Sequence, residues 1–270
     1  MMQNFFRTLD LFGVQYMIIS GQAAILYGAA TFSEDIDLWV APEKENWEKL
    51  MKLLRKFAGR VYKLTPPITL ELILKGHGFH FEFPPTKREQ LSWFLDVLGI
   101  LPRLSTFDIS WQKAISMKAC LGKIKVIGLR ALVEIKKTRR LEDYPVISNL
   151  VRVEYEKLST KKISLKDWEW ILTNSYNLDD ILYYFERHRA SREVARFLQR
   201  PCLSYCLKFI DSQQKKEKYF KLASKKIALE IEESRHRDRQ YWAPILTELR
   251  ELKENGKLLP QGSTPPDRIL

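Results

Sequence analysis

The sequence predicts a mixed α/β (α+β) fold in its first half and an all-helical fold in its second half. Apolar patterns typical of strands and of helices alternate through residues 1–152, whereas only helical periods follow in residues 153–258. Hydrophobic residues make up 45% of the 270 residues and charged residues 29%, a balance typical of globular proteins with a buried core. We therefore predict two domains, residues 1–152 and 153–258, followed by a flexible Pro- and Gly-rich tail at residues 259–270.

Strand and helix signals alternate in the first domain. Residues 16–20 are an apolar run that suits a strand buried on both faces, and Gly21 interrupts this run before a short helix that ends near Gly28. Residues 36–40 alternate as a second strand does. Further strands are predicted at residues 68–74, 79–83, 93–98 and 124–127, and further helices at residues 4–12, 45–57 and 129–138.

The second domain shows helical periods only. The residues Tyr241–Pro244 are interpreted as the packed start of the last helix. Several aromatic residues could stack nucleobases, but aromatic residues at helical spacing more often form core. They are Trp168, Trp170, Tyr183, Tyr184 and Phe185. Helices are predicted at residues 165–173, 178–188, 193–198, 215–233 and 241–254.

Charge and cysteine usage limit the class of protein. The formal net charge of +12 suggests a polyanionic partner such as nucleic acid, although the basic excess is spread over both halves. No uncharged apolar run reaches the length of a membrane span, and residues 1–10 lack the layout of a signal peptide. Cys202 and Cys206 are interpreted as reduced, buried thiols, which suits a cytoplasmic protein. No membrane partner is expected.

Two short segments of the first domain suit phosphate and metal binding. Gly21 at a strand-to-helix turn lets the backbone approach a ligand closely, the following helix offers unpaired N–H groups, and Ser20 adds a hydroxyl. Asp35 and Asp37 lie two apart on a strand, so both point to one face and can hold Mg²⁺ through oxygen. The structural alternative is a simple turn followed by solvated acids at a sheet edge.

The stretch that joins these segments, residues 18–38, resembles motif one of the DNA polymerase β-like nucleotidyltransferase superfamily. More narrowly, it is similar to minimal bacterial forms related to abortive-infection type IV toxins. The resemblance implies a nucleotidyltransferase-like mixed sheet flanked by helices and a Mg²⁺-dependent, two-metal transfer of nucleotide from an NTP. Two departures are visible: Ser20 replaces the first Gly of the motif, and Thr31 stands where an Arg is often found.

A second stretch, residues 129–150, resembles a motif of a largely unannotated bacterial group in that superfamily. Lys136 and Arg140 are expected one helical turn apart on one face, where both could reach a triphosphate. Asp143 could orient Arg140, and Pro145 suits the first turn of the next helix. The alternative is a solvated basic helix end.

The expected third carboxylate of the site is Asp96. It lies in an apolar strand, where a charged group needs a partner that a metal ion could supply. Glu82 and Asp108 are its rivals, because the sequence does not give the strand order. His77 and His80 flank Gly78 and are interpreted as a turn that enters a strand.

These residues predict transfer of a nucleoside monophosphate from an NTP to an acceptor hydroxyl. Asp35, Asp37 and Asp96 would act as metal ligands, with Ser20, Gly21 and Lys136 on the phosphates. The expected acceptor is an RNA or tRNA end or a protein, in a toxin–antitoxin or phage-defence setting with a cognate partner protein. The alternatives are a non-catalytic nucleotide-binding module and a small-molecule transferase of the aminoglycoside type.

Overall fold

The computed structural model describes residues 2–85, 91–119 and 122–269, and the chain splits into two compact units. The first, here called the sheet unit, comprises Met1–Leu26, Ala30–Ile135 and Gln240–Leu270. The second, here called the helical unit, comprises Tyr27–Ala29 and Lys136–Arg239. The expected domain boundary at residue 152 lies inside one continuous helix, α7 (Asp143–Ser159), which belongs entirely to the helical unit.

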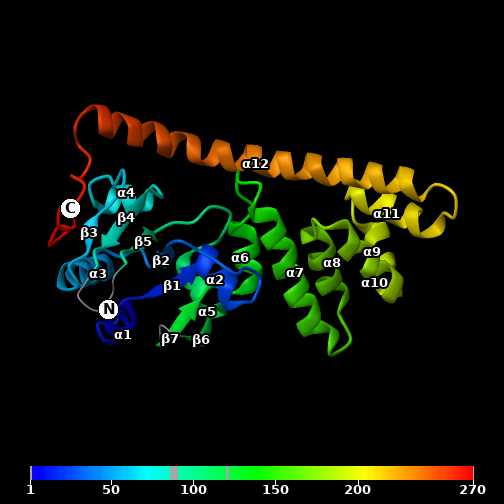
Figure 1. Ribbon diagram of the computed structural model, residues 1–270, viewed down its shortest axis with the longest axis horizontal. Helices are drawn as coiled ribbons and strands as arrows, with labels where there is room; N and C mark the ends of the chain where they lie inside the picture. Colours follow the sequence, from blue (N-terminus) through cyan, green and yellow to red (C-terminus); the bar gives the residue numbers. More distant parts are fainter. Residues whose placement is uncertain (1, 86–90, 120–121, 270) are drawn as a thin grey trace. The chain divides into compact units, whose positions relative to one another are not determined.

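The sheet unit is built around one mixed sheet, which confirms the predicted fold class (Figure 1). The strands found in the described residues are β1 (Tyr16–Ile19), β2 (Ile36–Val40), β3 (Arg60–Val61), β4 (Gly78–Phe83), β5 (Trp93–Leu98), β6 (Ile115–Ala119) and β7 (Gly122–Val126). The helices that accompany them are α1 (Met2–Leu11), α2 (Ser20–Leu26), α3 (Lys44–Lys56), α4 (Leu70–Leu74), α5 (Phe107–Lys113) and α6 (Leu129–Ile135).

The strand order places the predicted site strands in the middle of the sheet. The order is β3-β4-β5-β2-β1-β7-β6, so β2 lies between β5 and β1. The pairs β2–β5 and β1–β7 are parallel, and the remaining neighbours are antiparallel. A side chain on β2 therefore has neighbours on β1, the preceding strand, and on β5, which comes much later in the sequence.

One face of the sheet at β4 and β5 is core, and the opposite face is half exposed. Phe79, Phe81 and Phe83 are fully buried, whereas the residues that alternate with them on β4 are partly exposed. Phe83 stacks on Trp93 of β5 with ring centroids 3.8 Å apart. This alternation is what a strand with one buried face requires, and it leaves the polar side chains of both strands on the accessible face.

Several elements differ from the sequence prediction. The expected strand at residues 68–74 is helix α4, because the side chain of Thr69 caps it by accepting a hydrogen bond from the Leu72 amide at 3.2 Å. The helix expected at residues 129–138 ends at Ile135. Strands β3 and β6, the two edge strands of the sheet, and helix α5 were not predicted, and neither was the helix at Pro201–Asp211.

The C-terminal residues are packed against the sheet unit, so the expected flexible tail at residues 259–270 is wrong. The Gly262 amide donates to the Val61 carbonyl and the Val61 amide to the Ser263 carbonyl, both at 2.8 Å. Arg55 forms an ion pair with Asp267 at 2.7 Å, and Ile269 is fully buried. The segment therefore covers the exposed edge of β3.

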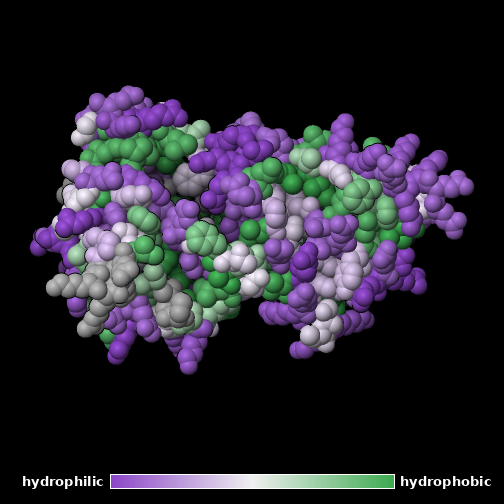
Figure 2. All heavy atoms as spheres, in the orientation of Figure 1, coloured by the Kyte–Doolittle hydropathy of each residue, from purple (hydrophilic) through white to green (hydrophobic). Residues whose placement is uncertain are grey.

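The helical unit confirms the prediction of an all-helical second half. In addition to α7 it contains α8 (Leu165–Asn174), α9 (Leu178–Arg187), α10 (Arg189–Phe197) and α11 (Pro201–Asp211). Helix α12 (Lys216–Glu254) runs without a break through Tyr241–Pro244, where a helix start was expected. Hydrophilic side chains predominate along α12 (Figure 2). No described helix is long and apolar enough to cross a membrane.

Candidate active site

The turn between β1 and α2 is held in an unusual conformation. Ser20 has a φ of +56°, a left-handed conformation that costs a non-glycine residue of the order of 1 kcal/mol. Gly21 follows it directly, and a Cβ there would lie 2.9 Å from the Cβ of Ser33 and closer still to its hydroxyl. Only glycine therefore fits at position 21, and the turn packs closely on the segment that leads to the carboxylates.

The segment from Ser33 to Asp37 leads into β2 and carries both predicted metal ligands, Asp35 and Asp37. The Ser33 hydroxyl donates to the Asp35 carbonyl at 3.0 Å, and β2 begins at the next residue. Asp35 and Asp37 are both partly exposed. The contact of Gly21 with Ser33 thus links the turn predicted to bind phosphate to the two predicted metal ligands.

Asp96 lies directly beside Asp37 in the sheet. Strands β2 and β5 run parallel with Asp37 and Asp96 as register partners, so their side chains leave the same face of neighbouring strands about 5 Å apart. Glu82 lies one strand further out, where it accepts a hydrogen bond from Ser92 at 2.8 Å. Asp108 lies in the first turn of α5 and is exposed. Of the three rivals, Asp96 is the one that neighbours Asp37.

His80 is a member of this row that the sequence analysis missed. It is the register partner of Asp96 on β4, and its Nδ1 lies 2.8 Å from Asp96 Oδ1. A period of two along residues 79–83 already places His80 opposite the apolar face. Its pairing with Asp96 depends on the order of β4, β5 and β2, which the sequence does not give. The polar row Asp37–Asp96–His80 therefore crosses three adjacent strands; we call it the carboxylate row.

Asp37 and Asp96 of the carboxylate row, with Asp35 just before β2, offer the oxygen ligands that Mg²⁺ prefers. In the described residues, however, no three His, Cys, Asp or Glu side chains are placed to hold one ion. Asp96 Oδ1 lies 2.8 Å from His80 Nδ1.

The predicted phosphate residues of the second stretch lie in the helical unit. Lys136, Thr138 and Arg140 belong to the connection between α6 and α7, so the expected helical spacing of Lys136 and Arg140 is wrong. Lys136 is 5% exposed and is not the solvated helix end of the alternative reading. The chain leaves the helix at Ile135 because these three side chains converge on one buried acid.

That acid is Asp143, at the first position of α7. It is 2.8 Å from Lys136 Nζ, accepts a hydrogen bond from Thr138, and accepts another from Arg140 Nε at 2.9 Å. The expected orientation of Arg140 by Asp143 is therefore confirmed. Burial by itself would raise the pKa of Asp143, but the charge of Lys136 and these hydrogen bonds hold it below its ordinary value. We call these four residues the Asp143 cluster.

The two cysteines of α11 and His77 are buried and take no part in the candidate site. Cys202 and Cys206 are buried free thiols, and burial raises the pKa of each to about 12. They are therefore inert thiols at neutral pH. His77 is buried beside Glu248 at 2.9 Å, within the sheet unit, and takes no part in the carboxylate row.

No protein-family model and no curated protein sequence matches this chain. Among solved structures, it is similar to an antigenic nucleotidyltransferase-like protein from Paracoccidioides brasiliensis. The sequence identity is 13% and the TM-score is 0.41, over 64% of this chain and 90% of that chain. A likeness of this degree does not identify a family, so the residues of the sheet unit carry the functional assignment.

Proposed function

We propose that the protein is a Mg²⁺-dependent nucleotidyltransferase whose site is the carboxylate row with the Ser20–Gly21 turn. The observation that supports this most is the register of Asp37 with Asp96 on adjacent parallel strands. Two carboxylates side by side on neighbouring strands repel each other, and a bound cation would relieve that repulsion. Asp35, two residues before Asp37, adds a third oxygen ligand near the same edge.

Each residue has a role that follows from its position. Asp35 and Asp37 hold the cation, and the Ser20 hydroxyl with the backbone amides after it binds phosphate at the start of α2. Bound Mg²⁺ would neutralise the charge on the triphosphate. Asp96 accepts the proton of the acceptor hydroxyl. The acceptor oxygen then bonds to the α-phosphorus, the bond from that phosphorus to pyrophosphate breaks, and pyrophosphate leaves.

The acceptor that we propose is the hydroxyl of an RNA end, with a protein hydroxyl as the second choice. The net charge of +12 supports a polyanionic acceptor over a small molecule. The side chain of Arg140 is 54% exposed, which suits its predicted contact with phosphate. Lys136 as a phosphate ligand, a cognate partner protein and a cytoplasmic toxin–antitoxin setting remain predictions.

The test is transfer from labelled NTPs to an RNA pool, with pyrophosphate release as the second readout. We expect Asp35→Asn and Asp37→Asn each to lower the rate at least about 100-fold, because metal-held phosphate chemistry depends on charge and position. Asp108→Asn is the matched control, since it removes a carboxylate from an exposed helix of the same unit. Full transfer by the Asp35→Asn, Asp37→Asn double variant would refute the site.

A non-catalytic nucleotide-binding module is the second candidate, favoured by the direction of Asp96 Oδ1 toward His80. Calorimetry distinguishes the two. Tight binding of NTP with Mg²⁺ and no release of pyrophosphate in the presence of RNA would favour the module. Transfer to an aminoglycoside but not to RNA would instead assign a small-molecule enzyme.

A further inference from the structure

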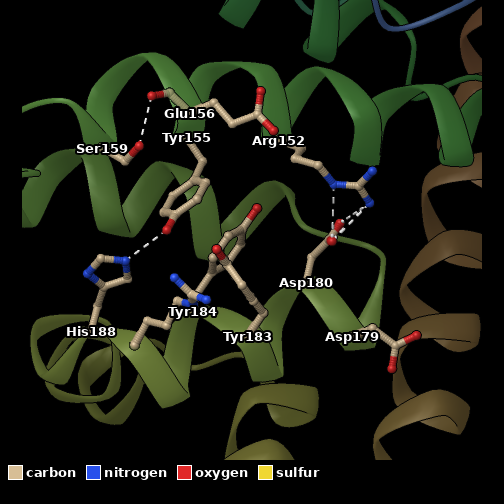
Figure 3. A pocket seen from close by; sticks show the side chains of 10 residues that line it. Arg152, Tyr155, Glu156, Ser159, Asp179, Asp180, Tyr183, Tyr184 and His188 are labelled. Carbon is tan, nitrogen blue, oxygen red and sulfur yellow. Dashed lines mark hydrogen bonds and ion pairs between the residues drawn. The ribbon is translucent and has the colours of Figure 1, made fainter.

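The helical unit contains a cavity of about 800 Å³ between α7 and α9, distant in sequence from the carboxylate row (Figure 3). Its lining includes Arg152, Tyr155, Asp180, Tyr183, Tyr184 and Arg187. Its volume falls in the range of cavities that hold small organic ligands. We call it the tyrosine pocket.

The walls of the tyrosine pocket are fixed by internal contacts. Arg152 donates to both carboxylate oxygens of Asp180, at 2.9 and 3.1 Å. The Tyr155 hydroxyl lies 2.8 Å from His188 Nε2. Burial, followed by the charge of Arg187, lowers the pKa of His188, so at neutral pH the imidazole is neutral. A preformed wall loses little entropy when a ligand binds.

One polar atom of the wall lacks a protein partner. Tyr184 is 1% exposed, and its hydroxyl has no hydrogen-bond partner among the described residues. Its ring extends from α9 toward α7 (Figure 3). Burial, followed by the charge of Asp180, raises its pKa, so the hydroxyl keeps its proton and is a donor. An unsatisfied buried hydroxyl costs about 1–3 kcal/mol unless a ligand completes it, which points to a ligand acceptor.

The pocket also offers an aromatic stacking surface. The Tyr183 ring is 41% exposed, and the Arg187 guanidinium lies 4.6 Å from its centroid. Tyr155 and Tyr184 pack with ring centroids 4.5 Å apart behind it. The guanidinium therefore covers one face of the Tyr183 ring, and both aromatic rings and guanidinium planes are surfaces on which a planar heterocycle stacks.

The charges of the lining exclude the simplest anionic ligand. Arg152 and Arg187 are opposed by Glu156, Asp179 and Asp180, a formal balance of −1. Arg152 is in addition already paired with Asp180. A free phosphate is therefore repelled, while an uncharged planar ring that both donates and accepts hydrogen bonds is suited to the hydroxyl and carboxylates.

We infer that the tyrosine pocket binds one unpaired nucleobase, stacked on Tyr183 and hydrogen-bonded to the Tyr184 hydroxyl. The inference goes beyond the proposed transfer reaction and does not depend on it. The aromatic residues that were interpreted as core therefore divide into two sets. Trp168 and Phe185 are buried core away from the cavity lining, whereas the buried Tyr184 and the exposed Tyr183 line the cavity.

The test is a titration of the full-length protein with 2-aminopurine riboside, whose fluorescence falls when its base stacks. We expect saturable quenching. Tyr183→Ala should weaken binding about 5- to 150-fold, the range for one lost stacked base. Tyr184→Phe should weaken it about 2- to 12-fold, the range for one hydrogen bond. The Tyr184→Phe variant keeps its ring and loses an unsatisfied hydroxyl, so its thermal stability should be unchanged or higher.

Tyr205→Ala is the matched control, because Tyr205 lies elsewhere in the helical unit and also has a cation over its ring, Lys208 at 5.4 Å. It should bind the riboside as the unmodified chain does. Asp37→Asn should also bind it normally, which separates this inference from the proposed transfer. The inference is overturned by absence of saturable quenching, by equal affinity of all the variants, or by preferential binding of inorganic phosphate or of the cation agmatine.

Discussion

At the scale of single residues, the site depends on a close contact that the sequence signals only in part. A glycine was expected at position 21 because of the tight turn. The structure shows that glycine is needed there because Ser33, twelve residues later, approaches the backbone closely. Asp96 was already expected from its apolar strand, and the strand register adds that it, rather than Glu82 or Asp108, neighbours Asp37. His80 was not predicted as a site residue for the same reason. The alternation along a strand shows which face a side chain is on, but its neighbours on that face depend on the strand order and register.

The contact of Gly21 with Ser33 predicts a specific coupling. Gly21→Ala should lower the free energy of unfolding by about 2 kcal/mol, because the new methyl group overlaps the Ser33 side chain. Ser33→Gly in the same chain should restore most of this loss. Urea denaturation of the two single variants and the double variant measures the coupling.

Gly78→Ala is the control for that series, since a Cβ there meets its nearest neighbour, His80, at an ordinary 3.5 Å. It should change stability far less than Gly21→Ala. Additive effects of Gly21→Ala and Ser33→Gly would show that the two positions do not interact, and the link between the turn and Asp35 would be lost.

At the scale of elements, segments with a strong apolar pattern were predicted, whereas β3, α5 and the eleven-residue α11 were not. The central strands β1, β2 and β5 follow from apolar runs and alternation. Strand β3 has two residues, too few for a pattern, and α4 was taken for a strand because its leucines and isoleucine fit either period. The end of α6 at Ile135 reflects the burial of Lys136 against Asp143, a tertiary effect.

The Asp143 cluster predicts a pH-dependent contribution to stability. Asp143→Asn should lower the free energy of unfolding by about 3–5 kcal/mol at pH 7, because it leaves buried Lys136 without its counter-charge. The pKa of Asp143 is depressed in the folded state, so its contribution is present above the ordinary carboxyl pKa near 4. It is lost as the pH falls further, through the folded value.

The measurement is urea denaturation of the unmodified chain and of Asp143→Asn, at pH 7 and below pH 4. The difference between their free energies of unfolding should be smaller at the lower pH. Glu193→Gln serves as the control, since it breaks an exposed ion pair with Arg189 in the same unit and should cost less than about 1 kcal/mol. A difference that stays constant with pH would contradict the ionic role of Asp143.

At the scale of the whole molecule, the two-part organisation was predicted but its boundaries were not. Composition separates an α/β part from a helical part, yet it does not show that residues 240–270 belong to the sheet unit. The Pro- and Gly-rich C-terminal segment resembles a loose tail in composition. Its packing depends on backbone hydrogen bonds to Val61 on the outer edge of β3. A local sequence pattern does not show that this edge lies next to the segment.

Removal of residues 259–270 should therefore destabilise the sheet unit by about 3 kcal/mol. The deletion loses the burial of Ile269 and the backbone hydrogen bonds to Val61 and Thr65. Thermal unfolding followed by circular dichroism measures the loss. Asp267→Asn, which breaks only the exposed pair with Arg55, should have little effect. An unchanged melting temperature after the deletion would mean that the segment does not pack.

The proposed function requires the carboxylate row to bind the divalent cation of a nucleotidyl transfer. Electron paramagnetic resonance of Mn²⁺, titrated into the protein with a non-hydrolysable NTP, tests it most directly. We predict Mn²⁺ binding that Asp37→Asn abolishes, that Asp96→Asn weakens and that Asp108→Asn leaves intact. Equal Mn²⁺ binding by all four chains would contradict the claim.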